Sequence, residues 1–233
     1  MNKDQVIKSK WFEEFPIGND EQGIYNFIDD VEQHEWEINK IEAQQQGWSE
    51  HNVTYNINRN GYRGAIESGM GVSAAFGCSC TFGSSVDEHH TWANILELAN
   101  CGQPGSSNDK IARLAISYIK TFKPTDIYVC WTFPSRREWV DPKGNMIRSF
   151  CRTFNEQRID ADSALFYLSN LRWDDYNYEK NKMLLESICY MHNVILHQTS
   201  VFKHPHDQYP RGRDLAHPGP DWHVIIAEQF LNN

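Results

Sequence analysis

Three polar side chains of this 233-residue chain have the types and spacing that nucleophilic acyl transfer requires. Ser79 lies in a segment of small residues, G-C-S-C-T-F-G over residues 77–83, which would present its hydroxyl in a sharp turn. A serine hydroxyl is a weak nucleophile and needs a base to remove its proton. Asp214 and His217 are three residues apart, and in a turn this separation lets the carboxylate bind one imidazole nitrogen while the other faces a serine. Together these residues predict serine-dependent ester hydrolysis through an acyl-enzyme.

The D-x-x-H spacing occurs twice, so it does not identify the acid–base pair by itself. Ten histidines among this many aspartates give about one such pair by chance, and Asp87 with His90 supplies a second. We favour Asp214 and His217 because they lie in a loop between a predicted strand and a predicted helix. His90 belongs to a helix-like segment after Ser79, which would carry it away from the serine. Taken alone, either pair could equally be a solvated surface turn without a catalytic role.

A loop punctuated by glycine is the candidate for stabilising the oxyanion. Residues 100–108 read N-C-G-Q-P-G-S-S-N and continue directly into the clearest predicted helix. Backbone N–H groups at such a helix start stabilise an anion, which is what a tetrahedral intermediate requires. Each residue of this loop, considered singly, is explained equally well by an alternative: an ordinary turn in which Ser or Asn caps the helix.

The region between residues 135 and 175 is rich in arginine and tryptophan. Its side chains could form a lid or a subsite for an anionic or sugar portion of a substrate, or they could belong to a loop whose arginines pair with nearby carboxylates. The residues in question are Arg136, Arg137, Trp139, Arg148, Arg152 and Trp173.

A metal site is not expected. Imidazole and carboxylate groups are common metal ligands, and the candidates are His197, His204, His206 and Asp207. They have neither a defined ligand spacing nor cysteine partners, so we predict neither a metal nor any other cofactor.

The elements that would position these residues alternate along the chain. Three short apolar runs, at residues 71–76, 126–132 and 193–199, are preceded or followed by helix-like segments. The clearest helix spans residues 106–123 and stops at Pro124, and others are predicted at about 161–192 and at 222–231. This alternation predicts an α/β domain with a parallel sheet and helices on both faces. Ligands of such sheets bind beyond the carboxyl ends of the strands.

The first 70 residues are polar and irregular, apart from a helix-like stretch at about 29–46. We therefore predict an accessory N-terminal segment, 1–70, packed on a main domain of residues 71–233.

Composition restricts the classes of partner. The net charge of −9 disfavours binding to nucleic acid. No apolar run approaches the ~18 residues that span a bilayer, and residues 1–15 lack a stretch of signal-peptide type. The six cysteines form no C-x-x-C pair, so we interpret them as reduced. These features predict a cytoplasmic protein that acts on a small-molecule or carbohydrate ester, without a membrane partner. They do not determine its oligomeric state.

Three segments resemble the sequence blocks of SGNH (GDSL-like) hydrolases. Residues 77–83 are similar to the first block, in the G-C-S-F-T-x-G variant of phage-type sequences, with Cys78 in place of the usual Asp. Residues 100–108 resemble the second block, and the resemblance assigns its oxyanion-binding N–H to Gly105 beside the Ser79 amide. Asp214-x-x-His217-Pro218 resembles the last block. The resemblance implies a three-layer α/β/α fold with a flavodoxin-like sheet and a Ser79, Asp214 and His217 triad.

Two further segments bear on this resemblance. Residues 55–64 are similar to an N-x-x-G-Y-R lead-in found before the first block of some members. After the third strand the family shows G-x-N-D, whereas residues 131–138 read W-T-F-P-S-R-R-E, so the Asn that donates to the oxyanion is missing. Thr132, Ser135 or Arg136 could replace it, and we also expect Arg136 and Asn108 to contact substrate. The missing Asn motivates an alternative, a weakly active or inactive SGNH-fold protein that binds a ligand or is associated with a virion.

Overall fold

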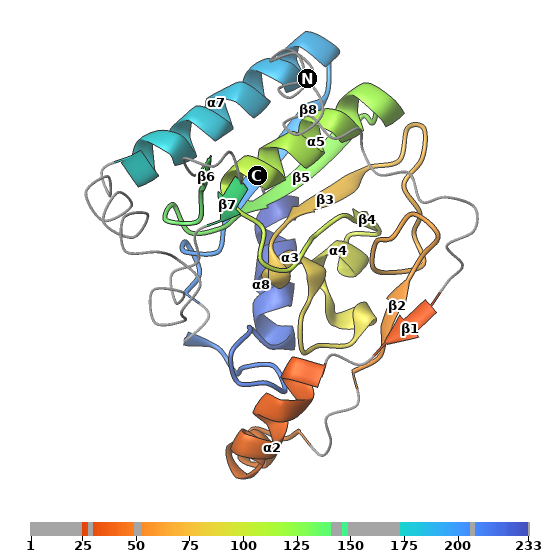
Figure 1. The fold of residues 1–233 in the computed structure, drawn as a ribbon. Coiled ribbons are helices and arrows are strands. Elements are labelled where there is room, and N and C mark those ends of the chain that lie inside the picture. The colour runs from red at the N-terminus through yellow and green to blue at the C-terminus, as the bar shows by residue number, and fades with distance from the viewer. Residues whose placement is uncertain are drawn as a thin grey trace, which may run out of the picture.

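The computed structural model describes residues 25–27, 30–48, 53–140, 146–148, 173–205 and 208–232. Within them lies a four-stranded parallel sheet in the spatial order β4-β3-β5-β8 (Figure 1). Its strands are β3 (Ala74–Gly77), β4 (Ala99–Asn100), β5 (Asp126–Trp131) and β8 (Ile195–Ser200). In chain order this is 2-1-3-4, the order that begins flavodoxin-like sheets. The predicted α/β class and parallel sheet are confirmed.

Helices cover both faces of this sheet, as the alternation of apolar runs predicts (Figure 1). Helices α5 (Asn108–Phe122) and α7 (Trp173–His192) pack on the face to which Phe76 and Val129 point. Helices α4 (Trp92–Ile95) and α8 (Pro220–Leu231) pack on the opposite face, together with Ala75 and Cys130. Adjacent residues of β3 and β5 therefore enter different cores, because successive side chains of a strand point to opposite faces.

The helix ends follow from their capping residues. The Ser107 hydroxyl accepts a hydrogen bond from Lys110 N–H at 3.1 Å, so α5 begins at Asn108, two residues later than predicted. Lys123 adopts a left-handed conformation (φ 48°) and ends the helix before Pro124. Helix α8 begins at Pro220, in the first turn where proline is tolerated. The predicted start of the preceding helix, near residue 161, lies outside the described residues.

Several short elements were not expected from the sequence. Strands β1 (Tyr25–Phe27) and β2 (Tyr55–Ile57) pair antiparallel, as do β6 (Glu138–Val140) and β7 (Met146–Arg148). Helix α3 (Ser79–Phe82) and the 3-10 helix η1 (Glu88–His90) are each a single turn. The predicted helix near residues 29–46 is present as α2 (Asp30–Gln45).

The described residues before position 71 contact the sheet and its loops. Arg63 and Tyr55 are fully buried, and Arg63 forms an isolated bridge with Asn100 at the end of β4. The described cysteines are unpaired, and Cys151 lies outside the described residues. Among the described helices, none has the length and apolar character needed to cross a bilayer.

Candidate active site

Ser79 and Thr132 follow the two central strands at their carboxyl ends. Ser79 is the first residue of α3, two positions beyond β3, and Thr132 comes directly after the neighbouring strand β5. The chain leaves β3 toward β4 on one side and leaves β5 toward β8 on the other. This divergence creates the crevice in which doubly wound sheets bind their ligands. Ser79 is 7% exposed, so it is almost completely buried at this edge of the sheet.

The turn that carries Ser79 is held by the loop that follows β4. The Ser79 carbonyl accepts hydrogen bonds from Gly83 N–H (2.8 Å) and Ser84 N–H (3.1 Å), which close the turn on itself. Gly102 packs directly on this turn, because a Cβ at position 102 would overlap the backbone nitrogen of Phe82. Asn100 Nδ2 donates to Thr81 O at 3.0 Å. The two loops that the sequence assigned to the nucleophile and the oxyanion are therefore interlocked.

Arg63 also supports this turn. Its guanidinium donates to the carbonyls of Phe82 (2.9 Å), Gly83 and Val86 (2.6 Å), and it lies 4.5 Å from the ring centre of Tyr55. Sequence reasoning missed this role. The only signal was the N-x-x-G-Y-R segment itself, which gives no indication of its partners.

Asp214 and His217 form a hydrogen-bonded pair. Asp214 Oδ2 lies 2.6 Å from His217 Nδ1, and Asp214 Oδ1 accepts the N–H groups of Ala216 (2.9 Å) and His217 (3.0 Å). Burial raises the pKa of Asp214, but the hydrogen bond and charge of His217 outweigh it and lower that pKa to about 2. The carboxylate is therefore ionised at neutral pH and fixes the imidazole through Nδ1.

The other D-x-x-H pair has a different arrangement. Asp87 Oδ2 accepts a hydrogen bond from Arg213 Nη2 at 2.9 Å, which joins the first D-x-x-H segment to the loop of the second. His90 Nδ1 is buried without a hydrogen-bond partner, and burial lowers the pKa of His90. Of the two pairs, only Asp214 and His217 have an imidazole nitrogen bound by the carboxylate.

The loop that carries Asp214 and His217 is anchored to the loop that follows Ser79. Arg213 N–H donates to Ser85 O at 3.2 Å, and Gly212 N–H donates to His217 O at 2.9 Å. On its outer side, Trp48 Nε1 donates to Arg211 O at 2.9 Å, just beyond the end of α2. These contacts fix the Asp214 loop both to the serine turn and to the N-terminal helix.

The predicted oxyanion donors lie at the edges of the same region. Gly105 adopts a left-handed conformation (φ 71°) in a turn closed by the bond from Ser106 N–H to Gln103 O (3.2 Å). Thr132 is fully buried, and its hydroxyl lacks a well-aligned hydrogen bond among the described residues, although it lies near enough to the Cys78 thiol to help lower the pKa of that thiol. Such an unsatisfied buried hydroxyl is unusual, and functional sites are one place where it occurs.

Asn108 does not have the position expected of a substrate contact. It is fully buried, its Oδ1 accepts Thr132 N–H (3.0 Å), and its Nδ2 donates to the carbonyls of Thr132 (3.2 Å) and Phe133 (3.0 Å). Both ends of its amide are thus bound to the backbone that leaves β5. We correct the sequence-based assignment accordingly, since Asn108 positions Thr132 and has no group left for a substrate.

Arg136 is the last residue of the turn that follows β5, and both its N–H and its carbonyl are hydrogen-bonded. Its N–H donates to Phe133 O (2.9 Å), and its carbonyl accepts Asn108 N–H (3.0 Å). The Nε and Nη1 atoms of its guanidinium are buried without a hydrogen-bond partner. The pKa of Cys78 is held well below its usual value, chiefly by a hydrogen bond from Cys80 and in part by the positive charge of Arg136. Arg136 is therefore close to the residue that precedes Ser79.

Neither a scan against protein-family models nor a search among curated proteins finds a match for this chain.

The residues considered for a metal are dispersed. His197 Nε2 lies 3.1 Å from Asp126 Oδ1, His204 Nε2 lies 2.9 Å from Gln229 Oε1, and His206 and Asp207 lie outside the described residues. Among the residues that the structure describes, no three His, Cys, Asp or Glu side chains are grouped so as to hold a metal ion.

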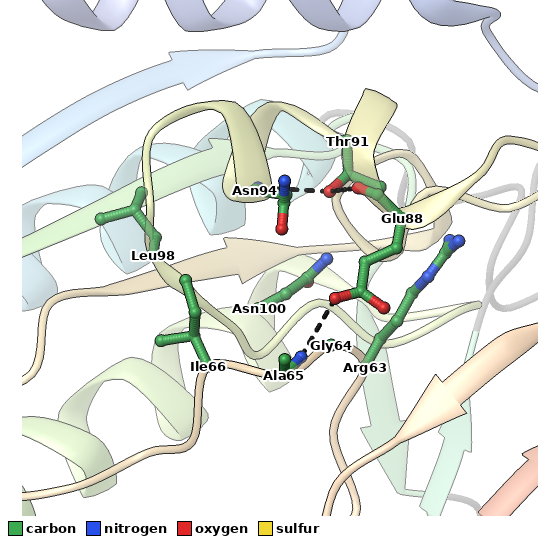
Figure 2. Close-up of a pocket in the computed structure, with 9 residues that line it drawn as sticks. All are labelled: Arg63, Gly64, Ala65, Ile66, Glu88, Thr91, Asn94, Leu98 and Asn100. Carbon is green, nitrogen blue, oxygen red and sulfur yellow. Dashed lines mark hydrogen bonds between the residues drawn. The ribbon is translucent and has the colours of Figure 1, made fainter.

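A small pocket near Arg63 does not serve the chemistry. It has room for on the order of one water molecule and is lined in part by Arg63, Glu88 and Asn100 (Figure 2). The Glu88 carboxylate accepts Ala65 N–H at 3.0 Å inside it, as the dashed line in Figure 2 marks. Arg63 and Asn100 donate to backbone carbonyls of the serine turn, and none of the predicted catalytic residues lines the pocket.

Proposed function

We propose that this chain is a serine-dependent hydrolase of small acyl esters, with Ser79 as nucleophile and Asp214 and His217 as its acid–base pair. The observation that carries the proposal is the 2.6 Å contact between Asp214 Oδ2 and His217 Nδ1. A carboxylate that binds Nδ1 fixes the tautomer in which Nε2 accepts a proton, and it stabilises the imidazolium that forms. The position of Ser79 at the carboxyl end of β3 is the second support.

In the proposed mechanism, His217 Nε2 removes the proton of Ser79 Oγ as that oxygen attacks the ester carbonyl. The Ser79 and Gly105 N–H groups, with the Thr132 hydroxyl, stabilise the oxyanion of the tetrahedral intermediate. His217 then returns the proton to the alcohol, whose C–O bond breaks, and Ser79 is left acylated. Water, deprotonated by His217, attacks this acyl-enzyme and releases the acid.

The SGNH type is part of the proposal. It is supported by the 2-1-3-4 order of the parallel strands and by the location of the three resembling blocks in loops that contact one another. The substrate would be a small acyl ester, such as an O-acetyl group on a carbohydrate. Thr132, whose hydroxyl is buried without a well-aligned hydrogen bond among the described residues, is the proposed replacement for the missing Asn.

A fluorophosphonate probe tests the proposal, since it labels only a serine that acts as a nucleophile. We expect labelling of the wild-type protein, none of Ser79→Ala, and unchanged labelling of Ser84→Ala, whose serine lies in the same loop. Hydrolysis of p-nitrophenyl acetate should follow the same pattern. A folded wild-type protein that neither takes the probe nor turns over the ester would support the alternative, an SGNH-fold binding or virion-associated protein without catalysis.

A further inference from the structure

Among the described residues, Arg136 differs from the neighbouring arginines in having no carboxylate partner. Arg137 Nε lies 2.9 Å from Asp174 Oδ1, and Arg113 Nη1 lies 2.5 Å from Glu138 Oε2. The carboxylates of Asp174 and Glu138 are thus already bound to other cations. Within the described residues, Arg136 Nε and Nη1 have no hydrogen-bond partner, although both atoms are buried.

Burial of two guanidinium nitrogens without hydrogen-bond partners is unfavourable, because their N–H groups lose hydration without gaining an acceptor. The Arg136 side chain is not a loosely held surface group, because hydrogen bonds from Asn108 N–H and to Phe133 O fix its backbone. Asn108 ties Arg136 to Thr132, whose Oγ1 is also buried, because its Oδ1 accepts Thr132 N–H at 3.0 Å and its own N–H donates to Arg136 O at 3.0 Å. This arrangement is expected at a site where a bound anion supplies the missing hydrogen-bond acceptors.

We propose that Arg136 binds a carboxylate of the substrate, so that the preferred ester carries a negative charge near its scissile bond. The inference rests on the proposed function, because it assigns the charge of the ester on which Ser79 acts. A guanidinium presents parallel N–H groups that match the two oxygens of a carboxylate, and a lysine at this position would lack that match. The protein therefore selects acidic esters over neutral ones of the same length.

Kinetics on matched esters test this selectivity. The charged substrates are monomethyl glutarate and 3-acetoxypropanoate, the neutral ones are methyl pentanoate and propyl acetate, and proton release is followed in a pH-stat. A hydrogen bond to a charged group stabilises a complex by about 1.5–3 kcal/mol, so the wild-type kcat/KM should favour at least one charged ester by roughly 10-fold or more.

In Arg136→Gln this preference should disappear, and in Arg136→Lys it should be reduced. Arg137→Gln, the control, should keep it. An equal preference in Arg136→Gln and the wild type, or none in either, would overturn the proposal.

Binding separates this inference from the proposed catalysis. Isothermal titration of Ser79→Ala with monomethyl glutarate should give binding that is lost in the Ser79→Ala, Arg136→Gln double variant. If the wild type hydrolyses no ester but this Arg136-dependent binding is present, the proposed function fails and the carboxylate site stands. Absence of binding, or binding that does not need Arg136, refutes the site. Arg136-dependent binding of inorganic phosphate without binding of the carboxylate would also refute it.

Discussion

The Asp87 carboxylate lies 2.9 Å from the guanidinium of Arg213, whereas only the backbone carbonyl of Asp87 accepts a hydrogen bond from His90, through the His90 N–H at 3.0 Å. The residue that follows Arg213 is Asp214, which binds His217. The first D-x-x-H segment thus stabilises the loop of the second. Two identical spacings thus have different contacts: Asp214 binds the imidazole of its own segment, whereas Asp87 binds Arg213 beside the other segment.

This relationship predicts unequal effects of removing the two histidines. His217→Ala should lower kcat/KM by roughly 10³-fold or more, because the base that activates Ser79 is lost. His90→Ala should have little effect on the rate. Hydrolysis of p-nitrophenyl acetate by both variants, with circular dichroism to verify that they are folded, measures the difference. The opposite ranking would mean that His90 is the base.

Thr132 should contribute to the transition state through its hydroxyl. Thr132→Val keeps the shape of the side chain and deletes this donor, so kcat should fall by ~100-fold or more with KM nearly unchanged. Thr199 offers a control at the carboxyl end of the next strand, where its hydroxyl already donates to Gln229 Oε1 at 2.6 Å. If Thr132→Val turns over as fast as the wild type, Thr132 only ends the strand, and Ser135 and Arg136 become the candidate donors.

Arg63 should affect both stability and turnover. Arg63→Lys cannot bind the three carbonyls of Phe82, Gly83 and Val86 together, so we expect a loss of about 3 kcal/mol in the free energy of unfolding. The folded protein should show a lower kcat at similar KM, because the serine turn is less well ordered. Arg59→Lys is the control, since that arginine is exposed and pairs with Glu67. Urea titrations and steady-state kinetics measure the two effects, and wild-type values of both for Arg63→Lys would contradict this role.

His223 should make the fold sensitive to acid. Burial, followed by the positive charge of Arg63, lowers its pKa to about 3, and its Nδ1 accepts Trp92 N–H at 3.3 Å. The unfolded chain takes up a proton at this histidine near pH 6.5, whereas the folded chain does so only near pH 3. Stability therefore falls as the pH decreases through this window, in total by roughly 4–5 kcal/mol from this residue.

The substitution His223→Asn isolates this effect, because an amide oxygen can still accept the Trp92 N–H. Between about pH 6 and pH 4 the variant should lose less stability than the wild type in urea titrations. Asp214 acts at lower pH, since its pKa of about 2 means that its contribution is lost only as the pH falls below about 4. Parallel pH profiles for variant and wild type above pH 4 would exclude His223 as the cause.

Local patterns predicted what depends on neighbours in the chain. The apolar runs predicted β3, β5 and β8, and Pro124 predicted the end of α5, whose start was placed two residues too early. The i, i+3 spacing predicted the contact of Asp214 with His217. The hydrogen bonds that hold the site in place could not be predicted from local patterns, because they join residues far apart in the sequence. Arg63 binds carbonyls 19 to 23 positions later, and Asn108 binds a strand exit 24 and 25 positions later. Strand β4, with two residues, is too short to show any periodicity.

The contact at Gly102 limits how this chain can evolve or be engineered. With no space for a Cβ between position 102 and the backbone of Phe82, the shapes of the two loops are mutually dependent. A change of length or sequence in one loop is tolerated only if the other loop moves with it. If this site were grafted onto another scaffold, residues 77–86 and 100–108 would have to be grafted together.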